Sequence, residues 1–248
     1  MAKRNKSKVV EERWMKKEQE GRRVREDEAY VKEPVQARNE KQKEFLRLLN
    51  TKDIVVFSAV AGAGKSTLAM CEVTDWLKKG YYDRVTICRP NVLMGKSLGM
   101  LPGTLREKYE VILAPMLQVI KDRYGNGFYE TSLSNGTIEL LSLEHARGRN
   151  IDQVMVIDEA QLTTPDQMYT MVTRLADGGK LIILGDPNQK DQNGIDGITW
   201  LLNFVDRHNL GDYFGYVEAD SRYIERGGVC KAMVQAMEHD NKRGEFDD

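Results

Sequence analysis

The 248-residue chain is long enough for one α/β domain with extensions. Its 37 Lys and Arg residues nearly balance its 38 Asp and Glu residues, so net charge alone indicates no polyanionic partner. No apolar run is long enough to span a membrane, and the basic start lacks the apolar stretch of a secretory signal. Three separated cysteines and three isolated histidines favour a reduced, cytoplasmic protein without a zinc cluster.

Residues 1–38 are strongly charged and contain few apolar groups. Such a segment cannot bury much surface, which predicts a mobile arm or a solvated helix. Two interpretations stay open here: a charged helix without a partner, and an arm that binds RNA or DNA. Residues 39–248 are then expected to form a single domain.

A strand, a glycine-rich loop and a helix follow one another near residue 60. The apolar run 53–58 leads into Ala61-Gly62-Ala63-Gly64, and a helical pattern begins at Lys65. Backbone N–H groups of such a loop surround phosphate oxygens, and the helix N-terminus adds a favourable dipole. Lys65 would reach the β- and γ-phosphates, and the Ser66 hydroxyl would hold Mg²⁺. The predicted nucleotide-binding residues of the loop are Gly62, Ala63, Gly64, Lys65, Ser66 and Thr67.

The first position of the general G-x-x-x-x-G-K-[ST] pattern is Ala59 instead of glycine. The A-G-x-G-K-S form is typical of superfamily-one helicases. The departure therefore favours that class of phosphate-binding loop.

Two further apolar strands end in polar groups. The run 153–159 ends in Asp158 and Glu159, which suits an outer-shell Mg²⁺ contact and a residue that orients or deprotonates the attacking water. Gln161 completes D-E-A-Q and is expected to couple the nucleotide to the rest of the site. The run 180–184 precedes G-D-P-N-Q, whose Gln189 amide would bond the γ-phosphate or the lytic water. Together the three motifs predict hydrolysis of a nucleoside triphosphate.

With these motifs in place, the chain resembles the PhoH-like ATPases over residues 39–240. The segments that carry the resemblance are Cys88-Arg89-Pro90, Leu98-Gly99-Met100-Leu101-Pro102-Gly103 with Glu107-Lys108, Arg147-Gly148-Arg149, and Thr163-Thr164-Pro165-Asp166-Gln167-Met168 with Thr173-Arg174. Leu162 stands where the family usually has Asn. Asp220-Ser221-Arg222 is similar to a C-terminal D-[IV]-V-R signature, but it is one residue short and Tyr223 replaces the usual histidine.

The resemblance implies a RecA-like P-loop NTPase core, an α/β fold with a mainly parallel sheet flanked by helices, that binds and hydrolyses ATP with Mg²⁺. Asn39 and Gln42 resemble the N-x-x-Q element that reads adenine in related ATPases, so Gln42 joins the expected cofactor-binding residues. Some members of the family act on RNA as helicases. A compact chain of this kind suits a bacteriophage or bacterial gene.

Phosphoryl transfer also needs positive charge on the γ-phosphate in the transition state. Residues 190–248 allow at most a short helix-and-strand extension, too little for a second RecA lobe. Arginines must then act within the chain or come from another subunit, which favours a homo-oligomer, expected to be a hexameric ring. The catalytic candidates are Arg147, Arg149, Arg174 and Arg222. For each of them, a surface or structural ion pair is the competing interpretation, and Arg174 is expected to close a helix over 167–175.

Residues 91–150 are predicted to interrupt the strand–helix alternation as a family-specific insert. Helical spacing covers 105–122, with a kink or split at Pro115 and a break at 124–127. A hairpin-like turn at 134–137 leads into a strand over 138–141. One interpretation places this insert over nucleic acid, and the other gives it packing and subunit contacts. The first assigns phosphate contacts to Lys96, Arg106, Lys108, Lys121 and Arg123, and stacking to Tyr124 or Phe128.

The leading hypothesis from the sequence is an ATPase that remodels RNA or single-stranded DNA, as a helicase or translocase. The alternative is a nucleotide-gated regulatory or assembly module that acts on a protein partner. A small-molecule kinase shares the phosphate-binding loop, but D-E-A-Q and G-D-P-N-Q suit water activation better.

Overall fold

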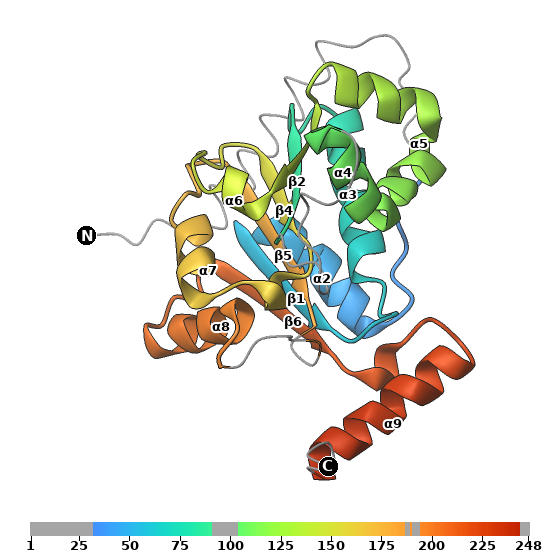
Figure 1. Cartoon of the computed structure of the whole chain (residues 1–248), viewed down its shortest axis with the longest axis vertical. Helices are drawn as coiled ribbons and strands as arrows, with labels where there is room; N and C mark the ends of the chain where they lie inside the picture. The colour runs from blue at the N-terminus through green and yellow to red at the C-terminus, as the bar shows by residue number, and fades with distance from the viewer. Residues whose placement is uncertain (1–31, 91–103, 187–188, 190–193, 244–248) are drawn as a thin grey trace.

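Six strands form one parallel sheet at the centre of the computed structural model (Figure 1). The structure describes residues 32–90, 104–186, 189 and 194–243, with the backbone alone in 105–106 and 241–243. The strands lie in the order β3-β2-β4-β5-β1-β6 across the sheet. Their bounds are β1 Ile54–Ala59, β2 Val85–Arg89, β3 Ile138–Ser142, β4 Val154–Ile157, β5 Lys180–Gly185 and β6 Phe214–Ala219.

The three strands predicted before the motifs are confirmed as β1, β4 and β5. Every residue of these strands is buried. A parallel strand covered on both faces has no solvent side, so its sequence is a continuous apolar run instead of an alternating one. This explains why these strands were visible in the sequence.

Helices cover both faces of the sheet (Figure 1). Val55 and Phe57 point to one core and Ile54 and Val56 to the other, because side chains alternate along a strand. The first core is closed by α2 (Glu40–Thr51), α3 (Lys65–Lys78), α4 (Leu105–Ile112) and α5 (Ala114–Ser134). The second is closed by α6 (Leu143–Ala146), α7 (Pro165–Val172) and α8 (Gly197–Arg207). The expected α/β fold with a parallel sheet flanked by helices is therefore confirmed.

Helix α7 begins and ends earlier than the predicted 167–175. Thr164 forms a capping box with Gln167, and Pro165 occupies the first turn, where its missing N–H costs nothing. The helix ends at Val172, and Leu175 forms a parallel bridge with Ile151 before β4 and β5 begin. Arg174 therefore lies after the helix, and the expectation that it closes the helix is wrong.

The segment predicted as an insert continues the alternation in its described part. Helices α4 and α5 connect β2 to β3, and β3 pairs parallel to β2, so the expected hairpin at 134–137 is wrong. Asn135 caps α5 and Gly136 has a φ of 78°, which makes this turn a helix end followed by an edge strand. The split at Pro115 is confirmed at the start of α5, and the break predicted at 124–127 is confirmed at Gly125, whose non-helical φ of 83° and ψ of 165° divide α5 into two helical segments.

The C-terminal part adds β6 to the sheet and then leaves it. The 3₁₀ helix η4 (Ser221–Tyr223) follows β6, and α9 (Val229–Arg243) stands away from the sheet (Figure 1). In the described residues this part contains no second lobe. No helix in the described part of the chain is both long and apolar enough to cross a membrane.

Residues 32–38, the described end of the charged arm, form no regular secondary structure and contact the domain. The Lys32 N–H donates to the Tyr124 hydroxyl at 3.2 Å, and the Glu33 carbonyl accepts from Arg123 at 2.8 Å. Val35 packs against the first core. Residues 1–31 lie outside the described residues, so the mobile or helical arm stays a prediction.

Candidate nucleotide-binding site

The three predicted motifs meet at one edge of the sheet. Strands β4, β5 and β1 are neighbours, and their carboxyl ends lie together because they are parallel. The glycine loop follows β1 and opens α3. Gly62 and Gly64 have φ angles of 86° and 84°, a region that side chains with a Cβ rarely adopt. The two glycines therefore permit the tight turn of the loop.

Lys65 lies back over the loop in this structure. Its Nζ donates to the carbonyl oxygen of Ala59 at 2.7 Å and lies 3.5 Å from that of Val60. Both acceptors are at the end of β1, so the ammonium group is held at the mouth of the loop.

Ser66 and Asp158 join the first motif to the second. The Ser66 hydroxyl donates to Asp158 Oδ1 at 3.1 Å, across 92 residues of sequence. These are hard oxygen ligands of the type that Mg²⁺ prefers, so the pair fits the predicted metal. Burial raises the pKa of Asp158, and the charge of neighbouring Glu159 raises it further. A cation next to this carboxylate would relieve both effects.

Glu159 has an unusual backbone and two side-chain contacts. Its φ of 51° is in the left-handed region, where a residue other than glycine is strained, and such strain clusters at functional sites. The carboxylate accepts a hydrogen bond from Gln161 Nε2 at 2.7 Å and lies 3.8 Å from Arg89. The Cys88-Arg89-Pro90 motif contains Arg89, but its partner could not be predicted, because the contact joins β2 to the segment after β4.

The amide of Gln161 connects the acidic motif to the third motif. Its Oε1 accepts from the Asp186 N–H at 3.0 Å, while Gln189 Nε2 donates to Asp186 Oδ2 at 2.8 Å. Gly185 allows this approach, since a Cβ there would lie 2.8 Å from Gln161 Oε1 and 2.4 Å from Ile198. Asp186 thus links Gln161 to Gln189, and Gln161 in turn bonds Glu159 directly.

Gln42 lies directly behind the loop. Its Nε2 donates to the Ala63 carbonyl at 3.0 Å, and its Oε1 accepts from the Arg38 N–H at 2.8 Å. The side chain is buried, with 3% exposed. Both ends of the amide contact backbone, so the structure gives Gln42 a loop-supporting position, and contact with adenine stays a prediction. Thr67 is exposed on the first turn of α3.

The four candidate arginines are not gathered at this site. Arg149 pairs with Glu139 on β3 at 2.9 Å, and Arg222 pairs with Asp220 at 2.7 Å. The Arg174 carbonyl accepts from Ile151 N–H before β4 begins, which places Arg174 at the amino edge of the sheet, opposite the loop. Arg147 follows α6 and is half-buried.

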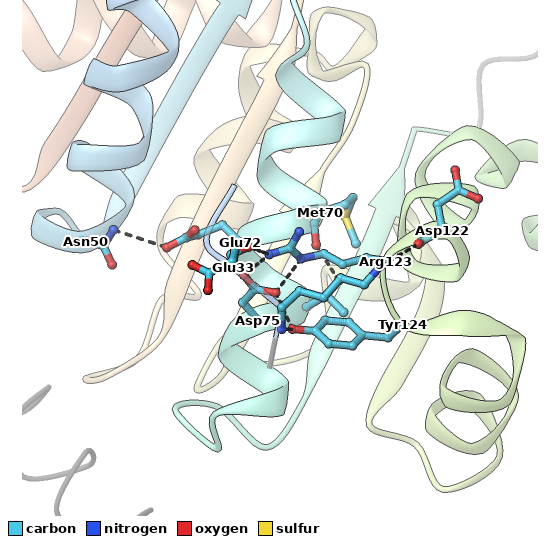
Figure 2. Close-up of polar contacts among 10 residues, drawn as sticks. Glu33, Asn50, Met70, Glu72, Asp75, Asp122, Arg123 and Tyr124 are labelled. Atoms are coloured by element: carbon cyan, nitrogen blue, oxygen red, sulfur yellow. Dashed lines mark hydrogen bonds and ion pairs between the residues drawn. The ribbon is translucent and has the colours of Figure 1, made fainter. Parts of the chain in front are cut away.

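Four of the residues predicted or considered for nucleic-acid contact in the described part of 104–150 have packing partners within the fold, and no polar or ring contact is seen there for the Lys108 side chain. Figure 2 shows Arg123 and Tyr124 of α5 pointing at Asp75 of α3. Arg123 donates to both carboxylate oxygens of Asp75, and the pair is 11% and 2% exposed. Burial and the hydrogen bond to Asp75 raise the pKa of Tyr124 to about 12.

Two other residues of this group also have contacts within the fold. Phe128 packs on Tyr124, with ring centroids 5.5 Å apart, and Lys121 lies over the Tyr129 ring. The packing interpretation therefore fits Arg123 and Tyr124 better than nucleic-acid contact. Lys96 and the Arg106 side chain lie outside the described residues.

Similarity to solved structures defines the class of fold. The large terminase of bacteriophage HK97 superposes with a TM-score of 0.55 at 12% sequence identity, over 87% of this chain and 49% of that one. With the glycine loop and the acidic strand in their places, this is the RecA-like P-loop NTPase fold.

The family follows from the sequence. The model of the PhoH-like protein family matches residues 34–238, and the chain belongs to that family. It is 34% identical to a PhoH-like protein of Bacillus subtilis, over 81% of this chain and 63% of the relative. A PhoH-like protein of Mycobacterium leprae is 37% identical, over 80% and 58%. The chain thus matches about three-fifths of the length of these relatives, and the resemblance found in the sequence is confirmed.

Proposed function

We propose that this protein binds ATP with Mg²⁺ and hydrolyses it. The observation that carries the proposal is the Ser66–Asp158 contact, which brings the first turn of the P-loop helix to the acidic strand end. That contact creates a hard-oxygen pair beside a phosphate-binding loop, the arrangement from which P-loop NTPases hold their metal.

The roles of the side chains follow from their positions. When bound, Mg²⁺ neutralises phosphate charge, and Ser66 and Asp158 are the residues that would hold it. Lys65 exchanges the Ala59 carbonyl for the β- and γ-phosphates. Glu159 accepts the proton of the water whose oxygen bonds to the γ-phosphorus, while the bond to the ADP oxygen breaks. Gln189 contacts the γ-phosphate or that water. Asp186 connects Gln189 to Gln161 through hydrogen bonds, so a shift of Gln189 changes the position of Gln161.

We also propose that hydrolysis is coupled to RNA or single-stranded DNA in a homo-oligomeric, hexameric ring. The support is the arrangement of arginines: in the described residues Arg149 and Arg222 have local partners, so a γ-phosphate arginine is expected from a neighbouring subunit. Arg147 and Arg174 are then the better candidates to act between subunits. Light scattering under turnover conditions tests the ring, and a fully active monomer would refute it.

The decisive experiment measures ATP turnover with and without RNA and DNA oligonucleotides of defined strandedness. Turnover should depend on Mg²⁺ and should rise with single-stranded nucleic acid, and binding of that strand should weaken with salt. Glu159→Gln is the matched variant, because it keeps the hydrogen-bond acceptor for Gln161 but cannot take the proton. It should retain ATP without turning it over. Absence of both stimulation and salt-sensitive binding would refute coupling to nucleic acid.

One observation favours a second candidate, a nucleotide-gated module that acts on a protein partner. Val229, Met233 and Met237 recur at every fourth position of α9 and are 78%, 60% and 45% exposed. Such a row is an apolar stripe of the kind that packs against another protein. The two candidates separate in the same assay, because a module of this kind would hydrolyse ATP without response to oligonucleotides.

A further inference from the structure

The loop after β6 is tied to the P-loop from the side opposite to the acidic motif. Strand β6 pairs with β1 along its whole length, and the Val60 N–H donates to the Ala219 carbonyl at 3.2 Å. Six residues later the Glu225 N–H donates to the Gly62 carbonyl at 3.0 Å. The segment from Ala219 to Glu225 is therefore fixed beside the phosphate-binding loop.

The same segment is tied to the start of α2. Asn39 Nδ2 donates to Glu225 Oε1 at 2.7 Å, and the Tyr223 hydroxyl donates to Glu40 Oε1 at 2.8 Å. Gln42 of α2 also donates to Ala63, so two elements far apart in sequence both contact the loop. Because Glu225 is held by these bonds, the backbone of the next residue, Arg226, is held next to the loop.

Arg226 lies along the P-loop. A Cβ placed on Gly62 would come within 3.3 Å of Arg226 Cδ and 3.4 Å of its Cβ, so the aliphatic stem of the arginine covers that glycine. The side chain is exposed, and in the described part of the chain no carboxylate lies within salt-bridge distance of its guanidinium. Arg89, Arg123, Arg149 and Arg222, by contrast, each have an acidic partner.

The sheet order sets the direction of a bound nucleotide. Asp158 follows β4 and Gln189 follows β5, so the metal and the γ-phosphate belong on that side of β1. Strand β6 lies on the other side of β1. The α- and β-phosphates and the nucleoside must therefore extend toward the loop that carries Arg226.

We propose that Arg226 contacts the α- and β-phosphates of the nucleotide from the β6 side of the P-loop. This inference rests on the proposed nucleotide-binding function and adds a residue to it. A guanidinium forms charge-assisted, often bidentate hydrogen bonds with phosphate oxygens. ADP and ATP both carry these two phosphates, so Arg226 is a binding residue for nucleoside di- and triphosphates. It does not act on the charge that develops at the γ-phosphate.

Equilibrium binding of a fluorescent ADP analogue and steady-state ATP hydrolysis test this role together. Arg226→Ala should raise the Kd for ADP and the KM for ATP by a similar factor of roughly 10–100, the loss expected for hydrogen bonds to a charged group. Its kcat should stay within about twofold, because a contact made equally in ground and transition states affects binding alone. Arg226→Lys keeps the charge but loses the planar fork, so its Kd for ADP and its KM for ATP should lie between those of the wild type and those of Arg226→Ala.

The matched control is Arg47→Ala, which removes one arginine charge from an exposed position of α2. It should leave both constants unchanged, and thermal unfolding should show all three variants folded. If Arg226→Ala lowers kcat while ADP binding stays the same, the residue acts on the γ-phosphate and the inference is overturned. Unchanged Kd and KM would overturn it as well. If the wild-type protein binds neither nucleotide, the proposed function itself fails.

Discussion

Helix α3 has a polar cluster at each end, and the two clusters differ in how their charges are compensated. Near its C-terminus, the buried Asp75 carboxylate accepts three hydrogen bonds from Arg123 and Tyr124 (Figure 2). At its N-terminus, the buried Asp158 carboxylate has one hydrogen bond, from Ser66, and the charges of Arg89 and Lys65 offset only part of the effect of burial and of the neighbouring Glu159, so its pKa stays raised. The first arrangement is complete as it stands, while the second gains from an added cation. We therefore interpret the first cluster as structural and the second as part of the proposed binding site.

The comparison predicts that the cluster at the N-terminus of α3 determines activity and that the cluster at its C-terminus determines stability. Lys65→Ala should give the largest effect on activity. We expect ATP turnover to fall by at least about 10²–10³-fold, because a preorganised positive charge at the phosphates is lost. The measurement is phosphate release under saturating Mg²⁺. Thermal unfolding of the same variant should change little, since Lys65 bonds two backbone carbonyls at a half-exposed site.

Asp75→Ala should give the largest effect on stability. Removing the carboxylate leaves Arg123 buried without its partner, and breaking such a pair typically lowers the free energy of unfolding by about 3–5 kcal/mol. Urea unfolding at neutral pH measures this loss. The control is Asp122→Ala, which removes an exposed acid of the neighbouring helix and should cost less than about 1 kcal/mol. Equal losses in the two variants would contradict the contrast between the clusters.

Asp158→Asn should act in the opposite direction on stability. The pKa of Asp158 lies above its ordinary value of 3.8, so the folded protein binds a proton there more readily than the unfolded chain does. The destabilisation is therefore absent below that ordinary pKa and develops as pH rises through the interval up to the raised pKa. We expect the Asn variant to be more stable at pH 7, by up to about 1 kcal/mol, the scale of a like-charge contact.

The stability advantage of Asp158→Asn should disappear below pH 3.8, where the wild-type carboxyl is protonated in both states. Thermal unfolding of both proteins across this pH range checks the sign. A variant less stable than wild type at pH 7 would show that the Asp158 charge already has a sufficient partner.

Arg149→Ala should have the smallest effect on stability. Its ion pair with Glu139 is half exposed, and such pairs contribute less than about 1 kcal/mol. Glu139 also keeps Arg84 at 3.9 Å and the Thr86 hydroxyl at 3.3 Å. Urea unfolding should therefore give a value close to wild type. A loss approaching that of Asp75→Ala would mean that burial is not what distinguishes the ion pairs of this fold.

The sequence predicted those features of the fold that depend on residues close together in the chain, and it missed most of those that depend on distant ones. Strands β1, β4 and β5 were predicted because each is a continuous apolar run that ends at a recognisable motif. Strand β6 was not specified, since its burial alternates along an edge of the sheet. The Asn135-Gly136 turn favoured a hairpin, because the same dipeptide suits a hairpin and the end of a helix.

The side-chain roles that the sequence missed all depend on distant partners. Arg123 and Tyr124 suited nucleic-acid contact by composition, but Asp75 lies 48 residues before Arg123 and neutralises it. The Arg89–Glu159 contact joins segments 70 residues apart and needs the strand order β2-β4. Predicting such pairs requires the topology of the sheet, which a single sequence does not specify.

The contacts of residues 32–38 bear on how a shortened version of this protein is designed. The family match begins at residue 34, which suggests a starting point close to it. A chain begun at 39 would remove the Glu33 carbonyl from Arg123 and the Arg38 N–H from Gln42, and so would loosen both α5 and the support of the P-loop. Expression vectors should accordingly place a cleavable tag ahead of Lys32.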